Sequence, residues 1–150
     1  MNWIDLDNKE YKEVNEFPIN CFGFIYCIEH IESGKFYIGK KNLSFTRKKK
    51  LGKKELALIE IKPGRRPTSK QVTTESDWLD YYGSSKELLS DIKKEGKDKF
   101  KRTIIQFAFN SKQLTYFETQ YQFSYNVLQR DNCWNNSILG KFHRKDFIID

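Results

Sequence analysis

The sequence predicts an α+β fold, in which a small sheet and helices share one core. Three observations point to it. Residues 22–40 form two apolar, β-branched and aromatic runs around a turn, residues 102–109 have the composition of a further strand, and residues 84–95 and 110–128 place apolar side chains at helical spacing. A chain of 150 residues is long enough for one domain, and neither a linker nor an internal repeat divides it.

The first two strands are predicted from FGFIYCIEHIESGKFYIGK, residues 22–40, with the turn at residues 32–35. If the loop holds an even number of residues, paired positions add up to an odd number. Tyr26 and Tyr37 then project from the same face of the sheet. A bulge at Gly34 would break this parity.

A strongly basic insert, about residues 41–76, follows the hairpin, and a polar, slightly acidic N-terminal extension, residues 1–20, precedes it. From Lys40 to Lys70 there are twelve Lys and Arg against two acidic residues, a net +10, so the rest of a chain with a total of +7 is net negative. Residues 62–74, with two prolines and a glycine, are predicted to form an exposed loop. Such a charge concentration matches a polyanion such as nucleic acid, although a charged run is often only solvated surface.

The first helix is predicted to begin with a capping box of Ser84 and Glu87 and to end at Gly96. Its apolar stripe consists of Leu88, Leu89 and Ile92.

The second helix is predicted to follow the strand at residues 102–109, with Asn110 or Ser111 as its cap, and to run to about Leu128. Its buried stripe consists of Leu114, Phe117, Tyr121, Tyr125 and Leu128. Glu118 lies on or beside this stripe. Because a buried ionised carboxylate without a partner is costly, Glu118 is predicted to be ion-paired, protonated or bound to a metal.

Two short segments, FIYCI and FYIGKK, resemble the halves of the GIY-YIG nuclease signature, with Phe24 where the family has its first glycine. Ten residues lie between Tyr26 and Tyr37, a spacing typical of the family. Three further positions match family residues: Arg47, ten after Tyr37, the catalytic arginine; Glu118, the metal-binding glutamate; and Asn135, or its neighbour Asn136, the C-terminal asparagine. With SDWLDYYGSSKELL and YFETQYQFSYNVL, which look like a phage-borne subgroup, the resemblance covers about residues 22–144.

This resemblance implies a small three-stranded antiparallel sheet flanked by helices, and a phage homing or DNA-degrading endonuclease that hydrolyses DNA phosphodiesters. The implied catalytic residues are Tyr26, Tyr37, Arg47, Glu118 and Asn135. Glu118 would hold one Mg²⁺ or Mn²⁺. Tyr26 would be the general base, or would position the attacking water together with Tyr37. A tyrosine pKa of about 10 must then be lowered by a basic setting, unless the metal shares the task.

Arg47 would clamp the scissile phosphate with its planar fork of donors. The residues predicted to bind nucleic acid are Gly39, Lys40, Lys41, Lys48, Lys49, Lys50, Lys53, Lys54, Arg65 and Arg66. DNA is the expected partner, and a homodimer is one way to cut both strands. Two alternatives stay open: a catalytically silent DNA-binding module, and an RNA-directed module that uses Trp78, Tyr81 and Tyr82 as exposed stacking platforms.

Three cysteines without a CxxC pair, in a chain with no signal peptide, predict reduced thiols in a cytoplasm-like compartment, which for a phage protein is the host cytoplasm. No apolar stretch is long enough to span a bilayer. Scattered thiols and two histidines do not favour a zinc site, and His30 and His143 are predicted to be surface residues.

Overall fold

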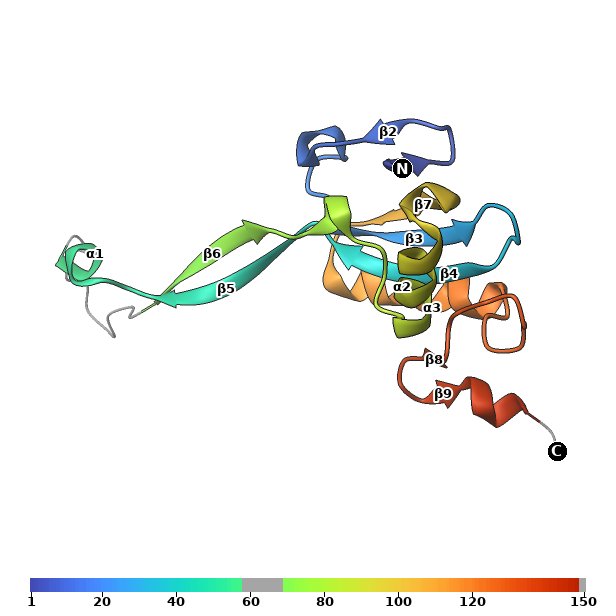
Figure 1. Ribbon diagram of the computed structural model, residues 1–150. Coiled ribbons are helices and arrows are strands. Elements are labelled where there is room, and N and C mark those ends of the chain that lie inside the picture. Colours follow the sequence, from blue (N-terminus) through green and yellow to red (C-terminus); the bar gives the residue numbers. More distant parts are fainter. Residues whose placement is uncertain (58–68, 149–150) are drawn as a thin grey trace. The chain divides into compact units, whose positions relative to one another are not determined.

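The computed structural model describes residues 1–57 and 69–148, which form two compact units (Figure 1). Residues 1–43 and those from 77 onward make the first, which we call the sheet unit. Residues 44–76 make the second, the ribbon unit. None of the helices in these described ranges is long and apolar enough to cross a membrane.

The sheet unit is built on a five-stranded mixed sheet, in the order β2-β1-β7-β3-β4. Its strands are β1 (Trp3–Asp5), β2 (Glu10–Tyr11), β3 (Gly23–His30), β4 (Phe36–Asn42) and β7 (Phe100–Ala108). β3 lies antiparallel to both β4 and β7, as predicted, whereas β1 runs parallel to β7. The α+β class is confirmed, but the prediction of three strands is wrong by two.

Both additional strands come from the N-terminal extension, whose polar composition concealed three buried aromatic side chains, Trp3, Tyr11 and Phe17. Trp3 is fully buried, packs edge-on against Phe24 at 5.0 Å between ring centroids, and donates a 2.7 Å hydrogen bond from Nε1 to the carbonyl of Trp78. Arg102 is also buried and donates to the carbonyls of Met1, Leu79 and Tyr81. These contacts fasten β1 onto β7.

The sheet has a separate core on each face because side chains alternate along a strand. On one face, Phe24, Tyr26 and Ile28 of β3 pack with α2 (Lys86–Glu95) and the N-terminal extension. On the other, Ile25 and Cys27 pack with α3 (Ser111–Ser124), so the two helices cover opposite faces (Figure 1). The shorter elements are the 3₁₀ turns η1 (Val14–Glu16), η2 (Trp78–Asp80), η3 (Lys97–Lys99) and η4 (Arg144–Phe147), and the strands β8 (Ser137–Ile138) and β9 (Phe142–His143).

Helix α2 begins one residue later than predicted. Ser85, not Ser84, is the cap, and its hydroxyl accepts a 3.3 Å hydrogen bond from the amide of Leu88. Gly96 ends the helix as predicted, with φ of 95°. Leu88 and Ile92 are buried four residues apart, but Leu89 is 43% exposed, because it lies about 100° further around the helix.

Helix α3 has Asn110 as its cap, one of the two predicted residues, with the side chain accepting from the amide of Gln113 at 2.8 Å. It ends at Ser124 rather than near residue 128, because Asn126 turns the chain with φ of 53°. Tyr125 is therefore exposed instead of buried.

His30 is buried, not on the surface as predicted. Its Nδ1 lies 2.7 Å from the hydroxyl of Ser33 and its Nε2 lies 3.0 Å from a carboxylate oxygen of Glu95. It therefore joins the hairpin turn to the end of α2.

The ribbon unit consists of β5 (Ser44–Lys50), α1 (Lys53–Ala57) and β6 (Ser69–Glu75). The two strands pair antiparallel from Ser44 opposite Glu75 to Lys50 opposite Ser69. The predicted loop at residues 62–74 is thus wrong for residues 69–74, while residues 62–68 lie outside the described ranges. Neither face of this ribbon is buried, so its sequence lacks the alternation that reveals a half-buried strand.

The N-terminal extension can be tested with two substitutions of large apolar residues in it. We expect Trp3→Ala to cost about 3–5 kcal/mol of unfolding free energy, because it opens a cavity in the core. Leu6→Ala, at a side chain that is 71% exposed, is expected to change it by less than about 0.5 kcal/mol. Urea denaturation measures both, and equal effects would show that the extension does not pack on the sheet.

Candidate active site

The two signature tyrosines lie on the same face of the β3–β4 hairpin, as predicted. Tyr26 pairs with Gly39 across the strands, and the rings of Tyr26 and Tyr37 have centroids 6.2 Å apart. A Cβ atom on Gly39 would lie 2.7 Å from Cζ of Tyr26 and 2.9 Å from Cε1 of Tyr37. The glycine therefore makes room for both rings and is itself buried beneath them.

Tyr26 is 1% exposed, and its burial raises the pKa of its hydroxyl well above the usual value, with smaller contributions from Tyr37 and Tyr81. This direction is opposite to the lowered pKa that we predicted for a general base. Tyr26 is a neutral phenol at working pH, and its ring supports Tyr37 from within the core.

Tyr37 is half-buried, and its hydroxyl is 3.1 Å from the hydroxyl of Ser84. Burial raises the pKa of Tyr37 and the hydrogen bond to Ser84 opposes that rise. Gly83, with φ of 93°, turns the chain so that Ser84 reaches this tyrosine just before α2 starts.

Glu118 lies in the middle of α3, half-buried beside the apolar stripe, as predicted. Burial raises the pKa of its carboxyl, and the charge and backbone amide of Lys40 oppose that rise. The ammonium of Lys40 binds the hydroxyl of Thr115 at 2.9 Å. Within the described ranges no ion pair of Glu118 is short enough to count as a salt bridge, so the charge and the backbone amide of Lys40 are what favour its ionised form.

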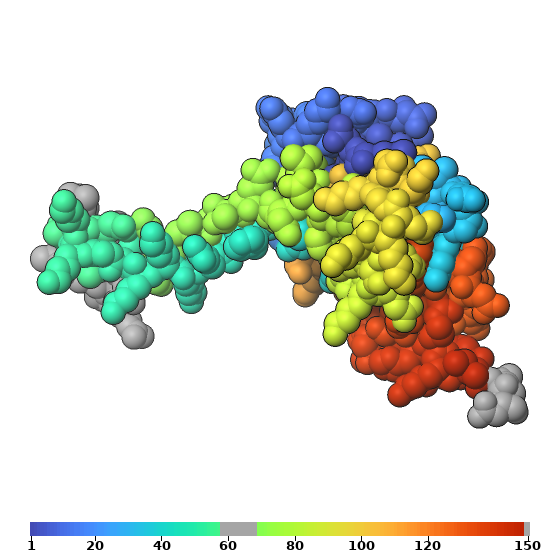
Figure 2. Space-filling model, in the orientation of Figure 1, coloured from blue at the N-terminus to red at the C-terminus, as the bar shows by residue number. Residues whose placement is uncertain are grey.

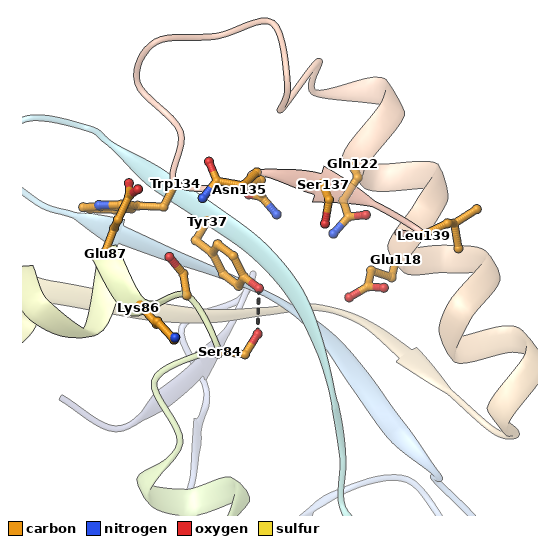
Figure 3. Close-up of a pocket in the computed structure, with 12 residues that line it drawn as sticks. Tyr37, Ser84, Lys86, Glu87, Glu118, Gln122, Trp134, Asn135, Ser137 and Leu139 are labelled. Atoms are coloured by element: carbon orange, nitrogen blue, oxygen red, sulfur yellow. Dashed lines mark hydrogen bonds between the residues drawn. The ribbon is translucent and has the colours of Figure 1, made fainter. Parts of the chain in front are cut away.

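Tyr37 and Glu118 share a pocket of about 500 Å³, and their polar ends point toward one another across it (Figure 3). The start of α2 forms one wall and α3 forms another. The residues that line it are Tyr37, Ser84, Ser85, Lys86, Glu87, Glu118, Gln122, Trp134, Asn135, Asn136, Ser137 and Leu139.

The donor atoms of this pocket fit a hard cation better than zinc. In the part of the chain that the structure describes, no three His, Cys, Asp or Glu residues cluster as metal ligands, so Glu118 would act with few other protein groups. Mg²⁺ commonly keeps several waters and takes one or two carboxylates plus phosphate oxygens. Zinc sites usually need three or four nitrogen, sulfur or carboxylate ligands from the protein.

Asn135 lines the pocket, but its amide is engaged by the protein. Oδ1 accepts from the amide of Ile38 at 3.0 Å and Nδ2 donates to the carbonyl of Ile38 at 2.8 Å, so the side chain holds the outer edge of β4. Arg144 in turn holds this loop by donating to the carbonyls of Val127, Cys133 and Asn135. Asn136, the predicted alternative, is exposed and also lines the pocket.

Most of the predicted basic residues lie in the ribbon unit. Arg47 is exposed on β5, opposite Val72. Lys48, Lys49 and Lys50 follow on the same strand, Lys53 and Lys54 lie on α1, and Arg65 and Arg66 lie outside the described ranges. In the sheet unit, Lys41 binds a carboxylate oxygen of Asp77 at 2.5 Å and lies over the ring of Tyr81.

The sequence interpretation missed several polar residues of the pocket, among them Ser84 and Lys86. Their signal was YYGSSK before the helix, which we interpreted only as a capping sequence. Two of the three aromatic residues considered as stacking platforms, Trp78 and Tyr82, are core residues with 1% and 7% exposure. Exposed stacking platforms would have favoured an RNA-directed module, and the prediction that Trp78 and Tyr82 are exposed is wrong.

Comparison with known families gave one match, to the family described as "Putative endonuclease segE, GIY-YIG domain", over residues 3–139. Searches of curated proteins and of solved structures gave no match. The matched range holds the whole five-stranded sheet, both tyrosines and Glu118. This chain thus belongs to the GIY-YIG endonuclease family, in the segE group.

Proposed function

We propose that this chain is a metal-dependent endonuclease that hydrolyses DNA phosphodiester bonds, with Glu118 as the ligand of one Mg²⁺ or Mn²⁺. The observation that supports it is the half-buried carboxylate of Glu118, which has a raised pKa and no ion pair within the described ranges. Partial burial disfavours the ionised form of a carboxylate, and a divalent cation would favour it.

In the proposed reaction the oxygen of a water molecule bonds to phosphorus while the bond from phosphorus to the 3′ oxygen breaks, and the proton lost by water is balanced by one gained at the 3′ oxygen. A bound Mg²⁺ would supply Lewis-acid stabilisation of the phosphate and of the leaving oxygen. Tyr37, kept neutral by its raised pKa, shares a hydrogen bond with Ser84, and its hydroxyl oxygen would accept a hydrogen bond from the attacking water. Its role is to orient that water.

Two cations are candidates for the contact with the scissile phosphate. Arg47 matches the family position, and its guanidinium can donate two parallel hydrogen bonds. Lys86 lines the same pocket as Glu118 and Tyr37. We favour Lys86, because it is the first residue of α2 and lines the pocket in the same unit as Tyr37 and Glu118.

The biological role that we propose is that of a phage homing or DNA-degrading enzyme. One pocket of this kind cuts one strand at a time. A double-strand break then needs a homodimer or two successive visits.

Nicking of supercoiled plasmid tests whether Glu118 holds the metal. We expect Glu118→Gln to lower the rate at least about 100-fold, because losing a metal that contributes several kcal/mol has an effect of this size. EDTA should abolish nicking by the wild-type protein, and Mg²⁺ or Mn²⁺ should restore it. Glu32→Gln, at an exposed carboxylate of the hairpin turn, serves as the control. Full activity of Glu118→Gln, or activity in EDTA, would contradict the proposal.

A second prediction uses stability instead of cleavage. Folding raises the pKa of Glu118, so ionisation of this carboxyl lowers the free energy of unfolding. This loss of stability is absent at a pH below the pKa that the carboxyl has in the unfolded chain. It is complete once the pH exceeds the pKa that the carboxyl has in the folded protein. In EDTA at neutral pH we therefore expect Glu118→Gln to melt at a higher temperature than the wild type, with about 2–4 °C for each kcal/mol of difference at this size.

Calorimetry in acid and with Mg²⁺ provides the control for this stability difference. At a pH below the unfolded pKa the two proteins should melt together. Mg²⁺ should raise the melting temperature of the wild type only. A wild type that is more stable than Glu118→Gln in EDTA would mean that the carboxylate has a stabilising partner.

The third prediction separates the two candidate cations. We expect Lys86→Ala to lower the cleavage rate about 10- to 100-fold, with a smaller effect of Arg47→Ala, because Lys86 lines the pocket that contains Tyr37 and Glu118. Single-turnover cleavage at saturating protein measures the chemical step without the effect on binding. A larger loss from Arg47→Ala would mean that Arg47, the residue at the family position, makes the contact with the scissile phosphate.

A further inference from the structure

The ribbon unit is a two-stranded antiparallel sheet whose side chains are exposed along both strands. From Thr46 to Lys50 every residue of β5 is exposed, and on β6 only Ser69 and Val72 are half-buried. In Figure 2 the unit is a narrow band of side chains, two strands wide. An isolated two-stranded hairpin is marginally stable in water, so an extended ribbon of this kind is suited to gaining stability from a partner.

The charge of this unit identifies the kind of partner. Residues 44–76 contain ten Lys and Arg against three Asp and Glu, a net +7, which equals the formal charge of the whole chain. The other residues contain seventeen of each sign and are neutral in sum. Attraction for a polyanion therefore originates in the ribbon unit.

The two faces of the ribbon differ in chemistry. One face, which we call the polar face, carries hydrogen-bonding side chains without an apolar residue: Ser44, Thr46, Lys48 and Lys50 on β5, and Ser69, Gln71, Thr73 and the acidic Glu75 on β6. Thr46 and Thr73 are hydrogen-bonded across the strands at 3.1 Å. The opposite face carries Phe45, Arg47, Lys49, Lys70, Val72 and Thr74, and its Lys70 is bound to Glu55 of α1 at 2.8 Å. Among the described residues, the ion pair of the ribbon unit therefore lies on the side of the opposite face.

We propose that the ribbon enters the major groove of double-stranded DNA with its polar face toward the base edges. Paired strands are about 5 Å apart and the major groove is about 12 Å wide, so a two-stranded ribbon fits. Lys48 lies directly opposite Gln71 at the centre of this face. Lysine can donate to O6 and N7 of guanine, and glutamine can pair with N6 and N7 of adenine.

The same geometry distinguishes DNA from RNA. The major groove of an A-form RNA helix is deep and narrow, and side chains cannot read it. That the partner is DNA rests on the proposed function, but the ribbon is proposed only to bind it and not to cleave it. Binding is therefore measured with Glu118→Ala protein, in which cleavage is removed and the ribbon is unchanged.

The experiment compares the affinity of two neighbouring variants for a short DNA duplex, by fluorescence anisotropy over a series of salt concentrations. Lys48→Ala and Lys49→Ala each remove one exposed lysine, but from opposite faces of the same strand. We expect Lys48→Ala, and likewise Gln71→Ala, to weaken binding about 5- to 100-fold, the range of one base-edge contact. Lys49→Ala should weaken it less than about threefold, because a lysine away from the groove contributes only through its charge.

A second duplex carries a bulky uncharged group at C5 of its cytosines, which fills the major groove without altering the phosphates. We expect at least about tenfold weaker binding to this duplex and to an RNA duplex of the same sequence. Equal losses from Lys48→Ala and Lys49→Ala, or equal affinity for the three duplexes, would overturn the inference in favour of non-specific attraction. Ribbon-dependent binding without any plasmid nicking by the wild-type protein would instead overturn the proposed endonuclease and support the ribbon inference.

Discussion

The register of the β3–β4 hairpin is the constraint on which the candidate site depends. Tyr26 faces Gly39 across the strands, so both tyrosines and the glycine lie on the face covered by α2. A shift of one residue would move both rings to the face of α3. Asn135 secures this register from outside, because it bonds both backbone groups of Ile38, the residue between Tyr37 and Gly39. The hydroxyl of Tyr37 reaches the pocket as a result.

The predicted parts of the fold are those that local sequence specifies. The hairpin, the end of α2 at Gly96 and the cap of α3 at Asn110 each depend on neighbouring residues. The strand at Trp3 was missed because its burial comes from contacts with residues more than twenty positions away, including the hydrogen bond to Trp78. The strand β6 was missed for another reason, since neither of its faces is buried and no periodicity marks it.

The candidate site, too, could be predicted from the sequence only in part. The spacing of the signature predicted Tyr37 and Glu118, and the structure brings them to one pocket. The spacing could not predict their environment, since the direction of a tyrosine pKa shift depends on burial by segments distant in sequence. Ser84 illustrates the limit of local patterns: it looks like a helix cap, but Ser85 caps and Ser84 bonds to Tyr37.

The distribution of charge relates the two units to the proposed chemistry. The pocket contains the carboxylates of Glu87 and Glu118, which repel phosphate, beside the ammonium of Lys86, and the sheet unit, whose charges cancel, supplies no general attraction for DNA. A divalent cation on Glu118 would reverse the sign of the charge at the pocket, while the ribbon unit would attract DNA whether or not the cation is bound. Affinity for DNA and competence for cleavage then depend on different residues. A protein without metal would still bind DNA, and the metal would determine only whether the bound strand is cut.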